Sequence, residues 1–197
     1  LRRAPRDATV RVAGIRAVVV PETIEAALNL DVAVAAVDKA LTAEPSTRAI
    51  EQPLAETKPG RTREALVGYR VLGHCATRFN ASQANRTQNV RLAVDAIDDT
   101  WVPAGGVFSL NANTGRRSPQ SGYKMANVYS GGRVVLGYGG GVCQVSTTAY
   151  NAALMAGMPI VERHPHSRSV PYVPCGRDAT VSWGAADMKF RNATPSP

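Results

Sequence analysis

The order of apolar and polar residues predicts a few elements at the start of the chain. Residues 9–21 (TVRVAGIRAVVVP) hold two runs with the apolar–polar alternation of strands, separated by Gly14, and predict a β-hairpin. Residues 31–41 place apolar side chains at helical spacing behind a capping Asp. Residues 47–56 (TRAIEQPLAE) predict a further strand, whose proline gives it an edge position. Together these elements make a small α+β segment.

A polar stretch separates this segment from a longer one. Residues 55–65 (AETKPGRTREA) are polar and contain a Pro-Gly pair, as linkers do. We therefore predict a small α+β segment over residues 1–58, a linker over residues 59–68 and a main domain over residues 69–193.

The main domain is predicted to combine two helices with many short strands. The helices are residues 82–99 and 142–156, and the second begins at a glycine-rich turn and stops at Gly157. Few helices among many short strands indicate an α+β fold with a mixed, mostly antiparallel sheet. The predicted strands and hairpins are residues 65–79, 103–111, 127–137, 158–166, 169–174, 179–184 and 188–192.

Composition narrows the classes of partner. The 197 residues carry 23 Lys and Arg against 15 Asp and Glu, and the net charge of +8 favours nucleic acid, anionic lipid or an acidic wall polymer. The basic residues are scattered and form no nucleic-acid-binding motif, so nucleic acid is not expected. No apolar run approaches the roughly 18 residues of a membrane span. The chain opens on Leu-Arg-Arg, and we expect it to be a piece of a longer protein.

The cysteines leave the redox compartment open. The chain has three, Cys75, Cys143 and Cys175, in no CxxC arrangement and beside only three histidines, so no metal site is expected. One disulfide with one free thiol would fit an oxidising compartment, and three reduced thiols would fit the cytosol.

Cys143 stands where a glycine run enters the second helix of the main domain (GGGVCQ). Glycines allow a sharp turn and the close approach of a ligand. The free amides and the positive end of the helix dipole favour thiolate over thiol, and the amides of Gly141, Val142 and Gln144 could hold an oxyanion. Two alternatives stay open: a small buried hydrophobe, or phosphate binding by the glycine turn, although no Lys-Ser/Thr pair follows it.

A nucleophilic cysteine needs a base. The helix is roughly 20 Å long and the strand that returns from it spans roughly 25 Å. An antiparallel return therefore brings His164 and His166 beside Cys143, on one strand face. Asp178 could orient a histidine, as the third member of a triad does. The alternatives are surface imidazoles and a turn Asp paired with a neighbouring Arg.

Two further side chains could contact a substrate. Arg168 could grip a carboxylate through bidentate contacts, and Ser146, within a turn of the cysteine along the helix, could line a pocket. Either could instead simply face solvent.

Four stretches of the main domain are recognisable together. They are TRFN…NRTQNVRLAVDAI, PAGGVFSLNANTGRRS…GYKMANV, GGGVCQVSTTAYNAALMAGMPIVERHPHS and GRDATVSW…DMKFRN. In order and spacing they closely resemble the VanW family over roughly residues 69–193. Residues 1–58 resemble the end of the peptidoglycan-binding region that often precedes VanW domains.

The resemblance implies a bacterial cell-envelope protein linked to glycopeptide resistance. Members of the family have been assigned L,D-transpeptidase activity, which forms 3–3 peptidoglycan cross-links with a catalytic cysteine. Carried over, that cysteine is Cys143 and the family's histidine is His166, whereas the position of His164 varies. Some relatives have serine in place of the cysteine, which this chain keeps.

The resemblance thus predicts acyl transfer between peptidoglycan stem peptides through a cysteine acyl-enzyme, without a metal or organic cofactor. We expect an extracytoplasmic monomer whose full-length form is membrane-anchored or secreted, touching the membrane only through a segment outside this chain. The alternatives are a non-catalytic module that binds the cell wall and a cysteine hydrolase that cleaves stem peptides.

Two positions depart from the family pattern, the pair His74-Cys75 and Cys175. Taken together with the resemblance, they predict a Cys75–Cys175 disulfide that leaves Cys143 free, which suits an extracytoplasmic protein.

Overall fold

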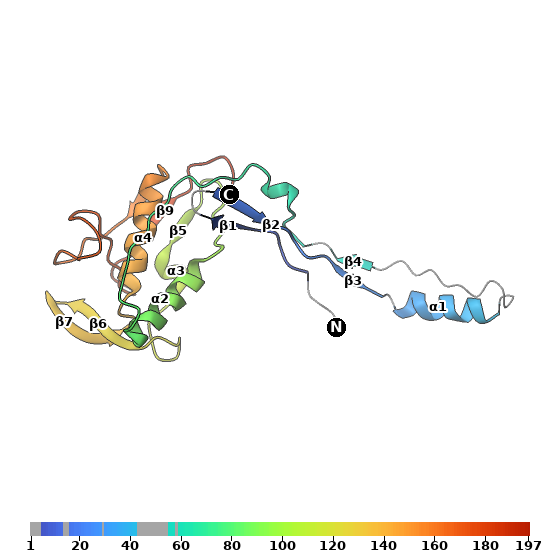
Figure 1. The fold of residues 1–197 in the computed structure, drawn as a ribbon, viewed down its shortest axis with the longest axis horizontal. Helices are drawn as coiled ribbons and strands as arrows, with labels where there is room; N and C mark the ends of the chain where they lie inside the picture. Colours follow the sequence, from blue (N-terminus) through green and yellow to red (C-terminus); the bar gives the residue numbers. More distant parts are fainter. Residues whose placement is uncertain (1–4, 14–15, 29, 43–54, 58) are drawn as a thin grey trace. The chain divides into compact units, whose positions relative to one another are not determined.

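The structure, a computed structural model, describes residues 5–13, 16–28, 30–42, 55–57 and 59–197. The chain divides into two compact units, Leu1–Val71 and Leu72–Pro197. Figure 1 shows the helices and strands of both units.

The first unit is built from short antiparallel pairs and one helix. β1 (Thr9–Ala13) pairs with β2 (Arg16–Val20), which confirms the predicted hairpin strands. α1 (Leu30–Leu41) confirms the predicted helix. β3 (Glu25–Ala27) pairs with β4 (Ala55–Thr57). Most of the predicted strand over residues 47–56 lies outside the described residues.

The segment predicted as a linker is hydrogen-bonded within the first unit. The Ala8 amide donates to the Arg61 carbonyl at 2.9 Å, and the Arg63 amide donates to a Glu22 carboxylate oxygen at 2.7 Å. A 3₁₀ turn, η2 (Glu64–Leu66), follows. The boundary between the units falls after Val71, a few residues beyond the expected linker.

The second unit combines three helices with small antiparallel sheets, and it confirms the α+β fold class. β5, β9 and β8 form a three-stranded sheet in that order, and β6 and β7 form a hairpin turning at Gly131-Gly132. α2 packs against α3, α4 and β6. The elements are α2 (Ala84–Ile97), β5 (Val107–Ser109), α3 (Leu110–Thr114), β6 (Met125–Ser130), β7 (Arg133–Tyr138), α4 (Val142–Met155), β8 (Ile160–Glu162) and β9 (Lys189–Arg191).

Three predicted strands are wrong, because their residues find no strand to pair with. Residues 67–79 of the first lie outside any helix or strand, and past Val71 this segment packs on α4: a Cβ on Gly73 would lie 2.2 Å from the Ala152 carbonyl oxygen. Thr77 bonds Thr148 of α4 at 2.8 Å through its hydroxyl. Residues 169–174 form no strand, and residues 179–184 make only isolated bridges.

The core of the second unit lies between α2, α4 and the C-terminal segment. Phe108 of β5 stacks on Phe190 of β9 with ring centroids 4.9 Å apart. Val142 and Val145 on one face of α4 bury their side chains in this cluster. The start of α4 is therefore fixed by the apolar side chains that flank Cys143. The buried cluster comprises Ala93, Phe108, Leu110, Tyr123, Val142, Val145, Ala179, Val181 and Met188.

Glycine ends α4 as predicted. Gly157 has a φ of +70°, its amide donates to the Leu154 carbonyl at 3.0 Å, and the Met158 amide donates to the Ala153 carbonyl at 3.0 Å. These two bonds are the Schellman motif, which satisfies carbonyls left open at a helix end.

Asn89 of α2 holds the glycine turn that precedes α4. Its fully buried side-chain amide donates to the Lys124 and Gly140 carbonyls at 2.9 and 3.0 Å, and its oxygen accepts from the Lys124 amide at 2.8 Å. A Cβ on Gly140 would lie 2.6 Å from the Asn127 carbonyl oxygen. The turn is therefore pressed between α2 and β6, which explains a glycine at this position.

Asn89→Ala is expected to lower the free energy of unfolding by about 2–4 kcal/mol, because it removes three side-chain hydrogen bonds to the backbone of Lys124 and Gly140. Asn85→Ala is the matched control, since Asn85 lies one turn earlier, is exposed and donates one bond, to the Met125 carbonyl. Urea unfolding of both variants measures the difference. Equal losses would contradict the role given to Asn89.

Candidate active site

The thiol of Cys143 lies in the first turn of α4. Gly141, the residue before the helix, has a φ of +116°, a left-handed conformation that disfavours any residue with a Cβ. The Cys143 side chain is half-buried. Its sulfur lies 3.4 Å from the Thr180 hydroxyl and donates to the Val181 carbonyl at 3.5 Å. The C-terminal segment therefore covers one side of the thiol.

His166 lies between Cys143 and a carboxylate. Its Nδ1 bonds Oδ2 of Asp178 at 2.7 Å, its backbone amide donates to the same oxygen, and its side chain is 3% exposed. Its Nε2 is buried and makes no hydrogen bond to any described residue. His166 and Cys143 line the same pocket, and the interaction between their side chains shifts the pKa of both groups.

Asp178 is itself fixed by an arginine. Nη2 of Arg163 contacts Oδ1 of Asp178 at 3.0 Å, and Nε of Arg163 donates to the Asp178 backbone carbonyl at 2.7 Å. The Arg163 guanidinium lies 5.6 Å from the centroid of the Tyr150 ring of α4. The carboxylate is thus held by bonds on both oxygens, which orients the imidazole of His166.

The pKa shifts favour charge separation between thiol and imidazole. Burial acts to raise the pKa of Cys143, but hydrogen bonding by His166 and Thr180 outweighs it and leaves that pKa below its ordinary value. Burial acts to lower the pKa of His166, but Cys143 and Asp178 outweigh it and raise that pKa. The lower thiol pKa and the higher imidazole pKa together favour a thiolate–imidazolium pair.

Asp178 stays ionised beside this pair. Burial acts to raise the pKa of Asp178, but hydrogen bonds from the His166 amide and ring outweigh it and lower the pKa. A thiol and an imidazole therefore line one pocket, and a carboxylate orients the imidazole, the set of groups that activates a thiol for covalent catalysis. The structure brings together Cys143, His166 and Asp178 of the predicted site, and their catalytic roles stay predictions.

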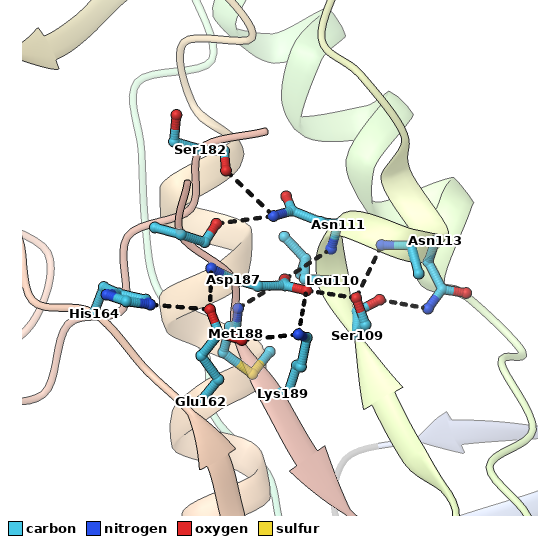
Figure 2. A network of polar contacts seen from close by, with 12 residues as sticks. Ser109, Leu110, Asn111, Asn113, Glu162, His164, Ser182, Asp187, Met188 and Lys189 are labelled. Carbon is cyan, nitrogen blue, oxygen red and sulfur yellow. Dashed lines mark hydrogen bonds and ion pairs between the residues drawn. The ribbon is translucent and has the colours of Figure 1, made fainter. Parts of the chain in front are cut away.

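His164 lies outside this arrangement, which corrects its expected place beside Cys143. Its Nε2 contacts Oε1 of Glu162 at 2.9 Å, and its side chain is 43% exposed (Figure 2). β8 ends at Glu162 and Pro165 follows, so the regular alternation that would put both histidines on one strand face does not continue.

The predicted substrate-binding residues divide between pocket and core. Gly141 and Gln144 line the pocket that contains Cys143. Val142 and Ser146 are buried, and neither lines that pocket. Arg168 is exposed and donates to the Gly132 carbonyl at 3.2 Å, so the structure places it outside the pocket.

The amides predicted to hold an oxyanion are partly engaged. The Val142 amide donates to the Gly139 carbonyl and the Gln144 amide donates to the Gly141 carbonyl, each at 3.0 Å. The Gln144 side chain accepts from Nη2 of Arg86 at 2.7 Å and donates to the Arg78 carbonyl at 3.0 Å. Gln144 therefore braces the pocket wall.

The expected Cys75–Cys175 disulfide is not formed in the structure, in which all three cysteines are free thiols. Cys75 is half-buried in the extended segment that packs on α4, and Cys175 is exposed in the turn that joins the Pro174 carbonyl to the Arg177 amide.

A pocket of about 470 Å³ opens beside the thiol, a size typical of small-molecule and peptide sites. Sequence reasoning missed most of its lining, because these residues come from four separate segments and none stands in a motif of its own. The Arg116-Arg117 pair was noticeable only as local charge. The lining includes Arg86, Arg116, Arg117, Asn127, Tyr129, Tyr138, Tyr172, Thr180 and Trp183.

The residues that the structure describes include neither a metal-binding cluster nor a membrane-spanning helix. No group of three or more His, Cys, Asp or Glu side chains is placed to hold a metal ion. Among the same residues, no helix has the length and apolar character needed to cross a membrane.

Asp178→Asn is expected to slow any Cys143-dependent reaction about 10- to 100-fold, since it removes a charge-assisted hydrogen bond worth about 1.5–3 kcal/mol. Because Asp178 raises the pKa of His166, the variant should lower that pKa and move the alkaline limb of the pH–rate profile to lower pH. Exposed Asp95 of α2 supplies the control, Asp95→Asn. Rates of Cys143 acylation by a peptide donor against pH measure the shift, and identical profiles would contradict it.

Comparison with known proteins identifies relatives over most of the second unit. The family model described as VanW like protein matches residues 85–197. A Bacillus subtilis (strain 168) protein, named uncharacterized protein YoaR, is 44% identical over 150 residues, 75% of this chain and 50% of that relative. The vancomycin B-type resistance protein VanW of Enterococcus faecalis (strain ATCC 700802 / V583) is 27% identical over 121 residues, 57% of this chain and 42% of that relative.

The two alignments also show how much of each relative this chain covers. The chain spans about half the length of the curated relatives it matches. No solved structure matches the chain significantly.

Proposed function

The chain belongs to the VanW family, and from this premise we propose that it is a cysteine-dependent acyltransferase. Its substrates are peptidoglycan stem peptides, and its reaction is the L,D-transpeptidation that forms 3–3 cross-links. One observation carries the proposal: a half-buried thiol at a helix N-terminus shares a pocket with a buried histidine whose Nδ1 is bonded to a fixed carboxylate.

The first half-reaction forms a thioester. The Cys143 thiolate attacks the carbonyl carbon of the residue before the terminal D-Ala of a donor tetrapeptide stem. The C–N bond of the last peptide then breaks, and the His166 imidazolium donates its proton to the departing amine, so free D-Ala leaves. Asp178 keeps the imidazole in the tautomer whose Nε2 faces the sulfur.

The second half-reaction transfers the acyl group. The side-chain amine of an acceptor stem attacks the thioester carbonyl and forms the new amide bond. The amine proton passes to neutral His166, and the sulfur leaves as the thiolate, which restores the starting pair. Each step is balanced by groups of this chain and the two peptides.

Charge supports an anionic polymer as the partner. The chain carries a net charge of +8, and three arginines line the pocket beside the thiol, both of which favour negatively charged ligands. We extend the proposal to an extracytoplasmic monomer that acts at the cell envelope, where such a polymer is found.

Product analysis with a disaccharide-tetrapeptide muropeptide tests the proposal. The parent protein should release D-Ala and form a 3–3 cross-linked dimer visible by mass spectrometry, and Cys143→Ala should form none. Release of D-Ala without dimer would favour the hydrolase. Binding of the muropeptide with no release in the parent would favour a wall-binding module and overturn the enzymatic function.

A further inference from the structure

Arg117 is an arginine of the pocket that the reaction above leaves without a role. It follows α3, and its Nη1 donates to Oδ1 of Asn111 at 2.7 Å and to the Gly115 carbonyl at 3.0 Å. A Cβ on Gly139 would lie 2.5 Å from Cγ of Arg117. The glycine turn before α4 therefore leaves room for this arginine to reach the pocket beside Cys143.

The second terminal nitrogen of Arg117 has no partner. Nη2 of Arg117 is buried and donates to no acceptor among the described residues. Burial lowers the pKa of Arg117, and nearby Tyr123, Cys143 and Asp187 oppose that effect. A buried donor of a charged group without an acceptor is costly, and such a group often awaits a ligand.

The polar network in Figure 2 holds Arg117 in place through Asn111. The Asn111 amide donates to Oδ1 of Asp187 at 2.9 Å, and its side-chain nitrogen donates to the Ala186 carbonyl at 2.8 Å. The Ser109 hydroxyl donates to the other Asp187 oxygen at 2.6 Å. With its nitrogens engaged, Asn111 presents its oxygen to Nη1 of Arg117, so the guanidinium is positioned before any ligand arrives.

The charged side chains that line the pocket favour an anion as the ligand of Arg117. Its lining holds Arg86, Arg116 and Arg117 and includes no Asp or Glu. Nη2 of Arg86 is already engaged by Gln144 at 2.7 Å. Arg117 thus brings to the pocket a buried, unpaired donor on a rigid cation, in the same cavity as the thiol.

We propose that Arg117 binds the free α-carboxylate of the donor peptide's terminal residue, and that this contact makes Cys143 attack only the last peptide bond. The inference rests on the proposed function and adds its substrate rule: donors must end in a free carboxylate. Arg117 takes the clamp role that the sequence assigns to Arg168, which lies outside the pocket. A guanidinium suits the role because it pairs with carboxylates in a fixed geometry.

A comparison of two peptides tests this rule. The donor tetrapeptide ending in D-Ala and its C-terminal amide differ only in the group that Arg117 would bind. The parent should acylate Cys143 about 10- to 100-fold faster with the acid than with the amide, the range for one charge-assisted contact. Arg117→Gln should slow the acid to the rate of the amide and leave the amide rate nearly unchanged.

Three variants make the outcome specific. Arg117→Lys keeps the charge without the planar fork and should recover part of the preference, and Arg168→Gln should retain all of it. Equal rates for acid and amide in the parent would overturn the inference. A loss of rate in Arg117→Gln that is the same for both peptides would also overturn it, since that pattern belongs to a donor that stabilises the oxyanion.

Binding without chemistry separates this inference from the proposed function. In a Cys143→Ala background, calorimetry should show tighter binding of the acid than of the amide by a similar factor, and Arg117→Gln should abolish the difference. If the parent never forms an acyl-enzyme but this binding preference holds, the transpeptidase function fails and carboxylate recognition stands. Equal binding of acid and amide would contradict the inference alone.

Discussion

Cys143→Ala is expected to abolish formation of the acyl-enzyme with a tetrapeptide donor, a loss of at least about 10⁴-fold in rate. Removal of a catalytic nucleophile leaves only the contribution of binding and charge stabilisation. Cys75→Ser and Cys175→Ser are the matched controls, because both thiols are free and neither lines the pocket. Intact mass spectrometry with each variant measures the adduct.

The substitution should leave the fold intact. The Cys143 side chain is half-buried and makes only weak sulfur hydrogen bonds, with the Thr180 hydroxyl and the Val181 carbonyl, so its loss is expected to cost about 1 kcal/mol. A melting curve close to that of the parent assigns the lost reaction to chemistry. An adduct that persists in Cys143→Ala and maps to another residue would show that the nucleophile lies elsewhere.

His166→Gln is expected to lower the rate of Cys143 acylation by about 10²- to 10⁴-fold, the range for a general acid–base. Glutamine keeps much of the shape of the side chain, but it neither takes a proton from the thiol nor returns one to the leaving amine. His164→Gln is the matched control two residues away, since His164 bonds Glu162 and does not line the pocket. Single-turnover rates with a thioester or peptide donor measure both variants.

The pH dependence of the acylation rate tests the same role of His166, and the two pKa shifts give its direction. The pKa of Cys143 is lowered and that of His166 is raised. The thiolate–imidazolium pair should therefore persist at pH values between the two shifted pKa values. The rate should rise with pH as the thiol ionises below its ordinary pKa, and fall where the imidazolium loses its proton above the ordinary pKa of histidine. A His166→Gln variant as fast as the parent would overturn the role of His166 and favour His164 or no base.

Local signals in the chain predict the parts of the site that belong to one element. The helical period after the glycine run predicts α4, and Gly157 predicts its end because a left-handed cap needs glycine. The length of the return from that helix places His166 near the thiol, and in the structure the two side chains line the same pocket. These features depend on spacing along the chain, which sequence contains.

The spacing of residues along the chain does not predict features that depend on tertiary contacts. Apolar–polar alternation predicts a strand over residues 65–79, but alternation does not supply a partner strand, and past Val71 the segment pairs with α4 through side chains. His164 shares the spacing of His166 and yet turns to Glu162. Arg117 reaches the pocket because Asn111 accepts a hydrogen bond from it and because Gly139 has no side chain to block it. Gly139 lies far from Arg117 in sequence, so local patterns do not predict this contact.

The state of the Cys143 thiol in the resting protein can be measured without any substrate. In a Cys75→Ser, Cys175→Ser background, the thiolate absorbance near 240 nm follows one sulfur as pH is raised. The structure predicts a midpoint below the about 8.5 of an ordinary cysteine, and a midpoint that returns to that value or higher in His166→Gln. A midpoint at or above about 8.5 that His166→Gln leaves unchanged would contradict an activated thiolate–imidazolium pair.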